Sequence, residues 1–204
     1  MSKQNQKQLV LASASPRREQ LLQQIGLDFI VHPSDFQEKQ QPEPGETPAE
    51  FAIYNALGKA QKVASHYQNA IIIGVDTVVS FQEHLLGKPR DPEHAKEMLR
   101  LLSGTTHQVI SGIALLDTDR YRAHRIDNQI VTAAETTDVT MERLDETDID
   151  RYVASGEGTD KAAGYAIQGL GSLYIEKISG DYFNVVGLPI HLLRKLLRKM
   201  SINI

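Results

Sequence analysis

The sequence contains no cysteine and no tryptophan, and aromatic residues make up only 6% of its 204 residues. The absence of cysteine excludes disulfides, thiolate metal sites and a cysteine nucleophile. A formal net charge of −4 argues against nucleic acid as a bulk partner, since that function usually requires a basic surface. No apolar run reaches membrane-spanning length, and residues 1–8 form a polar tail without the apolar core of a signal peptide. We therefore expect a cytoplasmic protein that does not bind membranes.

The rest of the composition is that of a globular chain, with 41% apolar and 24% charged residues. Residues 70–79 and 107–116 are apolar at nearly every position, which is typical of strands buried on both faces. Amphipathic segments with helix-start signals lie around them, so we expect a single α/β domain over residues 1–204. Asp117-Thr118-Asp119 predicts a hairpin turn, and residues 173–178 predict a late strand.

Residues 9–18 have the pattern of a short apolar strand, a tight turn and the first turn of a helix. Ser15 is a suitable N-cap, and Pro16 fits the first helical position. Arg17 and Arg18 then add positive charge to a helix end that already carries partial positive charge, which favours a bound anion such as a phosphate. Two solvated arginines that point away from the helix axis explain this turn equally well.

Asp76 interrupts the apolar run of residues 70–79. A buried carboxylate is costly unless it is paired, hydrogen-bonded or bound to a metal. The pattern places Asp76 at the end of a central strand, where it can bind Mg²⁺ or act as a general base. The alternative is an aspartate that caps a neighbouring loop.

Four further residues are individually weaker candidates. Glu38 lies in a proline-rich loop, residues 32–47, that is long for a connection. Lys59 lies midway along a helix that begins with a capping box, and Lys88 is held in a turn between a glycine and a proline. Taken alone, Glu38 and Lys59 are expected to be solvated charges, and Lys88 also fits an ordinary surface turn. Gln168 lies in a glycine-rich segment and carries an amide that can read a base edge. Together these residues fit a metal-assisted phosphate chemistry, but they do not identify the substrate.

Six motifs, which occur in one order over about residues 9–192, resemble those of the Maf family of nucleoside triphosphate pyrophosphatases. They are Leu11–Arg18 (LASASPRR), Gly74–Val79 (GVDTVV), Gly87–Pro89 (GKP), Ser103–Val109 (SGTTHQV), Asp160–Ala162 (DKA) and Asn184–Pro189 (NVVGLP). The resemblance implies a fold like that of inosine triphosphate pyrophosphatases, an α/β fold with a long curved mixed sheet flanked by helices. It also implies two lobes with a central cleft. It further implies hydrolysis of a nucleoside triphosphate to the monophosphate and pyrophosphate with a divalent metal, Mg²⁺ or Mn²⁺.

The resemblance assigns roles to individual positions. Asp76 matches the catalytic aspartate, as a general base or a metal-linked carboxylate that activates water for attack on the α-phosphate. Glu38 matches an acidic metal partner, although the family often has Asp-Glu where this chain has Gln37-Glu38. Four positions match residues that face the phosphates, where lysine neutralises charge and arginine can grip two oxygens. These are Ser13, Arg18, Lys59 and Lys88.

Three positions imply a branch of the family. Arg17, Thr77 and Gln168 match the branch that acts on dTTP and UTP. The branch that acts on 7-methyl-GTP has Trp after the proline, Gln after the aspartate and Glu in place of Gln168. A neutral amide suits the O/N–H edge of thymine or uracil, whereas a glutamate suits a cationic methylated guanine. Ala163 and Ala166 replace residues that are more often glycine, and each is expected to add a methyl near the base pocket.

The sequence leaves more than one function open. Some family members are linked to arrest of cell division, so a regulator that binds a pyrimidine nucleotide without turnover is one hypothesis. The retained Asp76, Glu38 and lysines argue against a pure sensor. A 7-methyl-GTP-type pyrophosphatase is another hypothesis, and modified pyrimidine triphosphates are further candidate substrates. The basic face of the last helix, residues 190–200, is a solvated surface or a homodimer contact.

Overall fold

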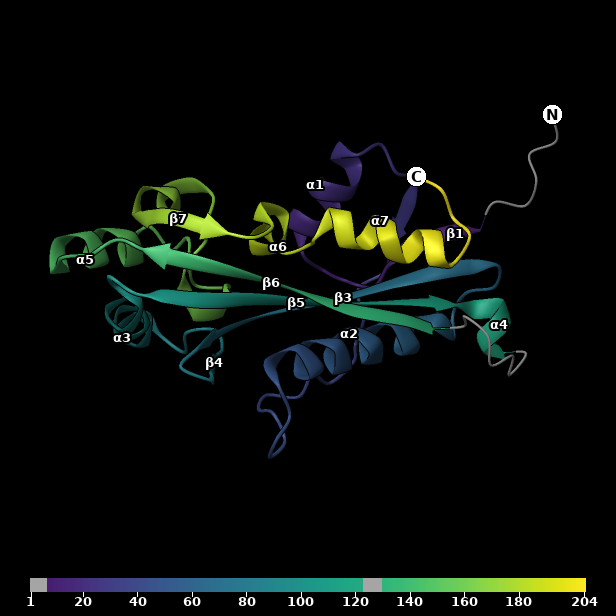
Figure 1. The fold of residues 1–204 in the computed structure, drawn as a ribbon, viewed down its shortest axis with the longest axis horizontal. Coiled ribbons are helices and arrows are strands. Elements are labelled where there is room, and N and C mark those ends of the chain that lie inside the picture. Colours follow the sequence, from purple (N-terminus) through teal and green to yellow (C-terminus); the bar gives the residue numbers. More distant parts are fainter. Residues whose placement is uncertain (1–6, 123–129) are drawn as a thin grey trace.

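A computed structural model describes residues 7–122 and 130–204 (Figure 1). The strands are β1 (Gln8–Leu11), β2 (Phe29–Val31), β3 (Ala70–Phe81), β4 (His84–Leu86), β5 (Thr106–Asp117), β6 (Ile130–Met141) and β7 (Ile175–Ser179). The α-helices are α1 (Pro16–Gln24), α2 (Pro48–Ala64), α3 (Pro92–Leu102), α4 (Thr118–Arg122), α5 (Glu146–Ala154), α6 (Tyr182–Val186) and α7 (Ile190–Lys199). Two 3-10 helices, η1 (Ala162–Gly164) and η2 (Gly169–Tyr174), precede β7.

The strands within the described residues form one seven-stranded mixed sheet in the order β2-β1-β3-β5-β6-β7, and β4 pairs with the end of β3. β1 is parallel to β2 and β3, whereas β3, β5, β6 and β7 are successively antiparallel. β3, β5 and β6 each contain 12 residues, so each extends for about 40 Å. These long strands extend across the molecule (Figure 1).

The helices cover both faces of this sheet. In Figure 1, α2 lies below the sheet, and α1, α6 and α7 lie above it. Helices α3 and α5 lie at the left-hand end of the view. The apolar core is correspondingly divided. One cluster lies under α1 and α7, a second lies between α2 and the sheet, and a third joins α3 and α5 to the ends of the long strands. The predicted α/β class, with a long mixed sheet flanked by helices, is confirmed.

Helix α2 lies unusually close to the sheet because two glycines face it. A Cβ at Gly74 would lie 2.0 Å from the carbonyl oxygen of Ala56, and one at Gly112 would lie 2.5 Å from the carbonyl carbon of Ala52. The predicted capping box at Thr47 is present and fixes where α2 begins. The side chains on the sheet-facing side of α2 therefore reach the middle of β3.

Three local predictions need correction. Gln8, predicted to belong to a polar tail, is the first residue of β1, while residues 1–6 lie outside the described part of the chain. Asp117-Thr118-Asp119 is not a tight hairpin turn, because the carboxylate of Asp117 accepts the next backbone N–H groups and starts α4. The strand predicted from residue 173 begins only at Ile175, after the 3-10 helix η2. Across the described ranges, no helix is both long and apolar enough to cross a membrane.

Candidate active site

A cleft of about 950 Å³ opens beside the middle of β3. Its walls come from the turn between β1 and α1, the loop before α2, the middle of β3, the loop after β4 and the segment after α5. The structure brings all nine predicted site residues to this cleft. They are Ser13, Arg17, Arg18, Glu38, Lys59, Asp76, Thr77, Lys88 and Gln168.

The centre of the cleft is an ion-paired group of three side chains. The Nζ atom of Lys59 lies 2.7 Å from Oδ1 of Asp76 and 2.7 Å from Oε1 of Glu38. Lys59 and Asp76 are buried, whereas 45% of the Glu38 side chain is exposed. The lysine ammonium thus neutralises two carboxylates that would otherwise repel each other. The prediction that Lys59 is a solvated helical lysine is wrong.

Asp76 lies in the middle of β3 and not at a strand end. Residues before and after it pair with β5, with Asp76 itself opposite Gly112, and the ladder continues to Ser80. The end was predicted too early because Asp76 interrupts the apolar run, whereas Thr77, Val78 and Val79 continue the strand along the cleft. The backbone of Asp76 is therefore held in the middle of the ladder with β5, which fixes the direction of its carboxylate.

The pair of carboxylates fits a divalent metal of the kind that the family resemblance implies. Mg²⁺ is usually held by one or two carboxylates together with waters and the phosphates of the substrate. Asp76 and Glu38 supply two carboxylates on one ammonium, and the described part of the chain shows no group of three or more His, Cys, Asp or Glu side chains that could hold a metal alone. This donor set suits a cation shared with a phosphorylated ligand.

Arg18 is buried at the edge of the cleft, where its guanidinium holds several segments together by hydrogen bonds. Its guanidinium donates to Ser13 Oγ at 2.8 Å, to the carbonyl oxygens of Gly187 at 2.9 Å and Val75 at 3.1 Å, and to Thr77 Oγ1 at 3.1 Å. Burial lowers the pKa of Arg18, and the negative charge of Asp76 opposes that effect; the group nevertheless stays charged at neutral pH. Four of its five N–H groups are used within the protein, so Arg18 has one N–H left for a ligand.

Arg17 and Thr77 lie beside Arg18. Arg17 donates from Nε to the carbonyl oxygen of Val186 at 3.2 Å, and partial burial lowers the pKa of its guanidinium. The hydroxyl of Thr77 also exchanges a hydrogen bond with Ser111 Oγ at 2.8 Å. The position that distinguishes branches of the family is therefore tied directly to the arginine of the first helical turn.

Lys88 and Gln168 both line the cleft and are exposed. The segments that carry them are joined by a hydrogen bond from the Ala163 N–H to the carbonyl oxygen of Gly87 at 2.9 Å. Ala163 adopts a left-handed conformation with φ of 57°, which explains why glycine suits this position. Its methyl is buried in the core cluster under α3, and not in the cleft as expected, whereas Ala166 does line the cleft.

Sequence reasoning missed Asn55, which is buried beside Asp76 and lines the cleft. Its amide donates to Asp76 Oδ2 at 3.3 Å. The available signal was its position four residues before Lys59, since residues i and i+4 share one face of a helix. It also missed Lys161, which lines the cleft and pairs with Asp160; this contact lowers the pKa of the Asp160 carboxyl.

The fold and the cleft define a class of α/β protein with a site that combines two carboxylates and several cations. The fold is similar to that of the Staphylococcus aureus Ham1 protein, with a TM-score of 0.52 and 18% identity over 95% of this chain and 100% of that one. Residues 8–200 match the family described as Maf-like protein. The chain belongs to this family.

Curated relatives match over nearly their whole length. A Methanosarcina mazei protein named dTTP/UTP pyrophosphatase is 43% identical over 97% of this chain and 96% of its own. Proteins with the same name from Dictyoglomus thermophilum and Bacillus cereus are 42% and 41% identical, over 96% and 98% of this chain and 97% and 93% of their own.

Proposed function

We propose that this protein hydrolyses dTTP and UTP, and modified pyrimidine triphosphates of the same shape, to the nucleoside monophosphate and pyrophosphate. The observation that carries the proposal is the ion-paired group of Asp76, Lys59 and Glu38 at the centre of a cleft with cations on its walls. The names of the full-length relatives support the same reaction and the same substrates. Residues 1–204 act as one domain in this proposal.

We assign binding of the triphosphate to the turn between β1 and α1 and to Lys88 in the loop after β4. Ser15 is the N-cap of α1, but its side chain makes no capping hydrogen bond. The first-turn amides of α1 are therefore available to phosphate oxygens. The hydroxyl of Ser13 accepts from Arg18 and keeps its own proton to donate. Arg17 and Lys88 supply the accessible positive charge, while Arg18 mainly holds the turn in place.

The chemical step is assigned to Asp76. Its carboxylate accepts a proton from a water molecule as the water oxygen bonds to the α-phosphorus. The bond from the α-phosphorus to the bridging oxygen then breaks, and pyrophosphate leaves with that oxygen. Lys59 and the cations of the cleft stabilise the charge that accumulates on the leaving group. A divalent cation held by Asp76 and Glu38 would neutralise phosphate charge and polarise the reacting phosphate.

Selection of the base is assigned to Gln168, whose neutral amide lies at the cleft wall beside Ala166. A 7-methyl-GTP-type activity is the weaker alternative because that branch has a glutamate at this position. A regulator without turnover is also weaker, since a pure sensor has no need for the buried Asp76–Lys59 pair. A cytoplasmic location, a homodimer and the absence of nucleic-acid binding remain predictions.

The test is release of pyrophosphate from a panel of nucleoside triphosphates with Mg²⁺ or Mn²⁺. The wild type is compared with Asp76→Asn and with Asp35→Asn, a matched change at a carboxylate that is 80% exposed and outside the cleft. We expect turnover of dTTP and UTP that falls at least about 100-fold in Asp76→Asn only. If no nucleotide is hydrolysed but dTTP binds, the protein is a sensor. If 7-methyl-GTP is preferred, the assignment of Gln168 is wrong.

A further inference from the structure

Asn55 connects three parts of the site that are far apart in the sequence. It lies on α2 and is 1% exposed. Its Nδ2 atom donates to Asp76 Oδ2 at 3.3 Å on β3 and to the carbonyl oxygen of Lys39 at 3.4 Å. Its Oδ1 atom accepts from the backbone N–H of Lys39 at 3.0 Å. One buried amide therefore holds a carboxylate of the sheet and the main chain of the loop before α2.

The chemistry of these partners fixes the orientation of the amide. The Lys39 N–H is a donor, so it must face Oδ1, and Nδ2 is then the only atom that can face the carboxylate of Asp76. The reverse orientation would place two donors against each other and an oxygen against a negative charge. The contact of Oδ1 with Lys39 therefore determines that Nδ2 faces Asp76. Leaving a buried amide of this kind without hydrogen-bond partners is energetically costly.

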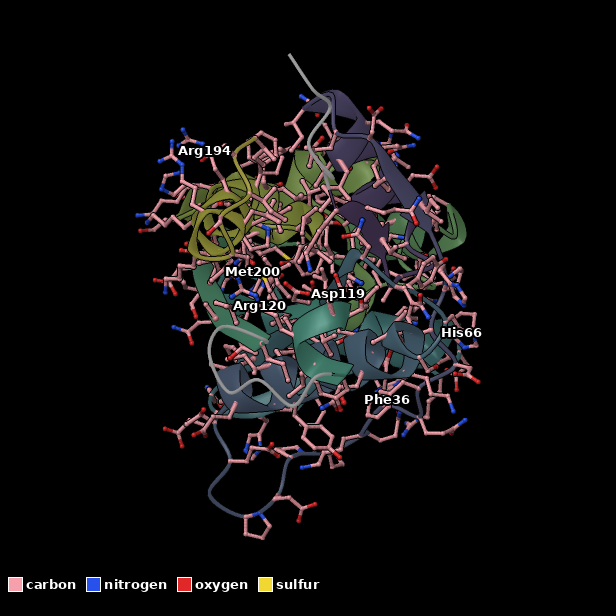
Figure 2. All side chains as sticks on the ribbon, turned by 90° about the vertical axis from the view of Figure 1, so that its right-hand side faces the viewer. Phe36, His66, Asp119, Arg120, Arg194 and Met200 are labelled. Atoms are coloured by element: carbon pink, nitrogen blue, oxygen red, sulfur yellow. The ribbon has the colours of Figure 1, made fainter. Side chains whose placement is uncertain are left out.

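The loop main chain that Asn55 holds is adjacent to Glu38. Residues 32–47 contain no helix or strand, and Glu38 itself is about half exposed. The loop is also anchored by Phe36, labelled in the lower part of Figure 2. Its ring fills the space beside Gly58 of α2. Lys39 in addition pairs with Glu46 and lies over the ring of Tyr54. Asn55 is a second link between this anchored loop and Asp76, beside the bridge that Lys59 forms from Asp76 to Glu38.

We propose that Asn55 is a positioning residue that sets Glu38 and Asp76 at the correct separation to share a divalent cation. The inference rests on the proposed function, since it takes both carboxylates as the ligands of the cation. Without Asn55, Asp76 loses its donor on Oδ2, and the Lys39 main chain loses both of its contacts to α2. Lys59 then remains the link between Glu38 and Asp76, and the flexible lysine side chain alone does not fix the separation of the two carboxylates.

The experiment compares the wild type with Asn55→Leu, which has the same branched skeleton but no polar side-chain atoms, and with Asn55→Ser, which is too short to reach Lys39 and Asp76 together. Gln61→Leu, on the exposed side of the same helix, is the matched control. Three quantities are measured: hydrogen exchange of the Lys39 amide, Mn²⁺ binding by electron paramagnetic resonance with a non-hydrolysable α,β-methylene analogue of dTTP, and the dependence of turnover on Mn²⁺ and on dTTP.

In both Asn55 variants we expect the hydrogen of the Lys39 amide to exchange faster than in the wild type. We also expect half-saturation to require at least about 10-fold more Mn²⁺, a typical effect of removing a group that orients metal ligands. The KM for dTTP at saturating Mn²⁺ should stay within about twofold of the wild type. A folded variant whose Mn²⁺ requirement is unchanged overturns the inference, as does a rise in the KM for dTTP alone. A wild type without Mn²⁺ binding or turnover would instead refute the proposed function, and the exchange of the Lys39 amide would still test the contact.

Discussion

Replacing Lys59 by methionine tests the central ion-paired group most directly. The change keeps an unbranched side chain of similar length but removes the ammonium that lies 2.7 Å from both Asp76 and Glu38. Removing one partner from a buried ion pair costs about 3–5 kcal/mol, because the remaining charge stays buried. The contact to the half-exposed Glu38 adds less than about 1 kcal/mol. We therefore expect Lys59→Met to lower the free energy of unfolding by about 3 kcal/mol in the absence of divalent metal.

The same variant should become responsive to Mg²⁺. In the wild type the ammonium competes with a cation for the two carboxylates, whereas in Lys59→Met they are available. For a site with a Kd of about 1 mM, 10 mM MgCl₂ stabilises the folded state by about 1.4 kcal/mol. Urea unfolding with and without Mg²⁺ measures both effects. Lys62→Met is the control, since Lys62 and Asp35 form a 3.8 Å pair whose side chains are 54% and 80% exposed, and it should change stability by less than about 0.5 kcal/mol.

Two results would refute this reasoning. If Lys59→Met lowers the free energy of unfolding by less than about 1 kcal/mol, the ion pair is not effectively buried. If Mg²⁺ stabilises wild type and Lys59→Met equally, Asp76 and Glu38 are not the carboxylates that hold the cation, and the metal must bind elsewhere.

Three further changes test other parts of the structure. Burial lowers the pKa of His107 from 6.5 to about 4, so between those values the unfolded chain binds the extra proton. The free energy of unfolding should therefore fall by about 2 kcal/mol from pH 7 to pH 5 through this group, and His107→Gln should remove that part of the pH dependence in urea unfolding. Gly112→Ala places a Cβ 2.5 Å from the α2 backbone and should cost about 3 kcal/mol, whereas Gly87→Ala, with nothing within 4 Å, should be nearly neutral in the same assay. Gln168→Glu should depress dTTP turnover by about 10-fold; unchanged kinetics would remove Gln168 from base recognition.

Much of the fold could be predicted from periodicity because the signals are local. The capping box at Thr47 and the proline after Ser15 mark the starts of α2 and α1 correctly. The structure overrides local signals where a distant side chain supplies the hydrogen bonds. The carboxylate of Glu157 accepts the N–H groups of Leu170 and Gly171. This contact holds the 3-10 helix η2, whose last two residues, Leu173 and Tyr174, were predicted to begin the strand.

The candidate site could be predicted only in part, since a sequence shows which residues are present but not what each contacts. Asp76 was identified because a carboxylate in an apolar run is unusual. Lys59 gave no comparable signal, and its partner Glu38 lies in a loop without periodicity. Their meeting depends on the close approach of α2 to β3, which Gly74 and Gly112 permit, and a pair of glycines on two strands has no recognisable pattern in a single chain.

The contacts of Thr77 suggest how a position that distinguishes branches of the family acts without reading the base itself. Its hydroxyl lies between Arg18 and Ser111, at 3.1 Å and 2.8 Å, so it is already engaged within the protein. A longer side chain at this position would have to displace the guanidinium of Arg18, which also holds Ser13 and the carbonyl oxygen of Gly187. A change at Thr77 would therefore move the turn between β1 and α1, to which we assign phosphate binding, relative to Gln168. We propose that substrate choice depends on where the triphosphate is held as well as on which edge of the base is read.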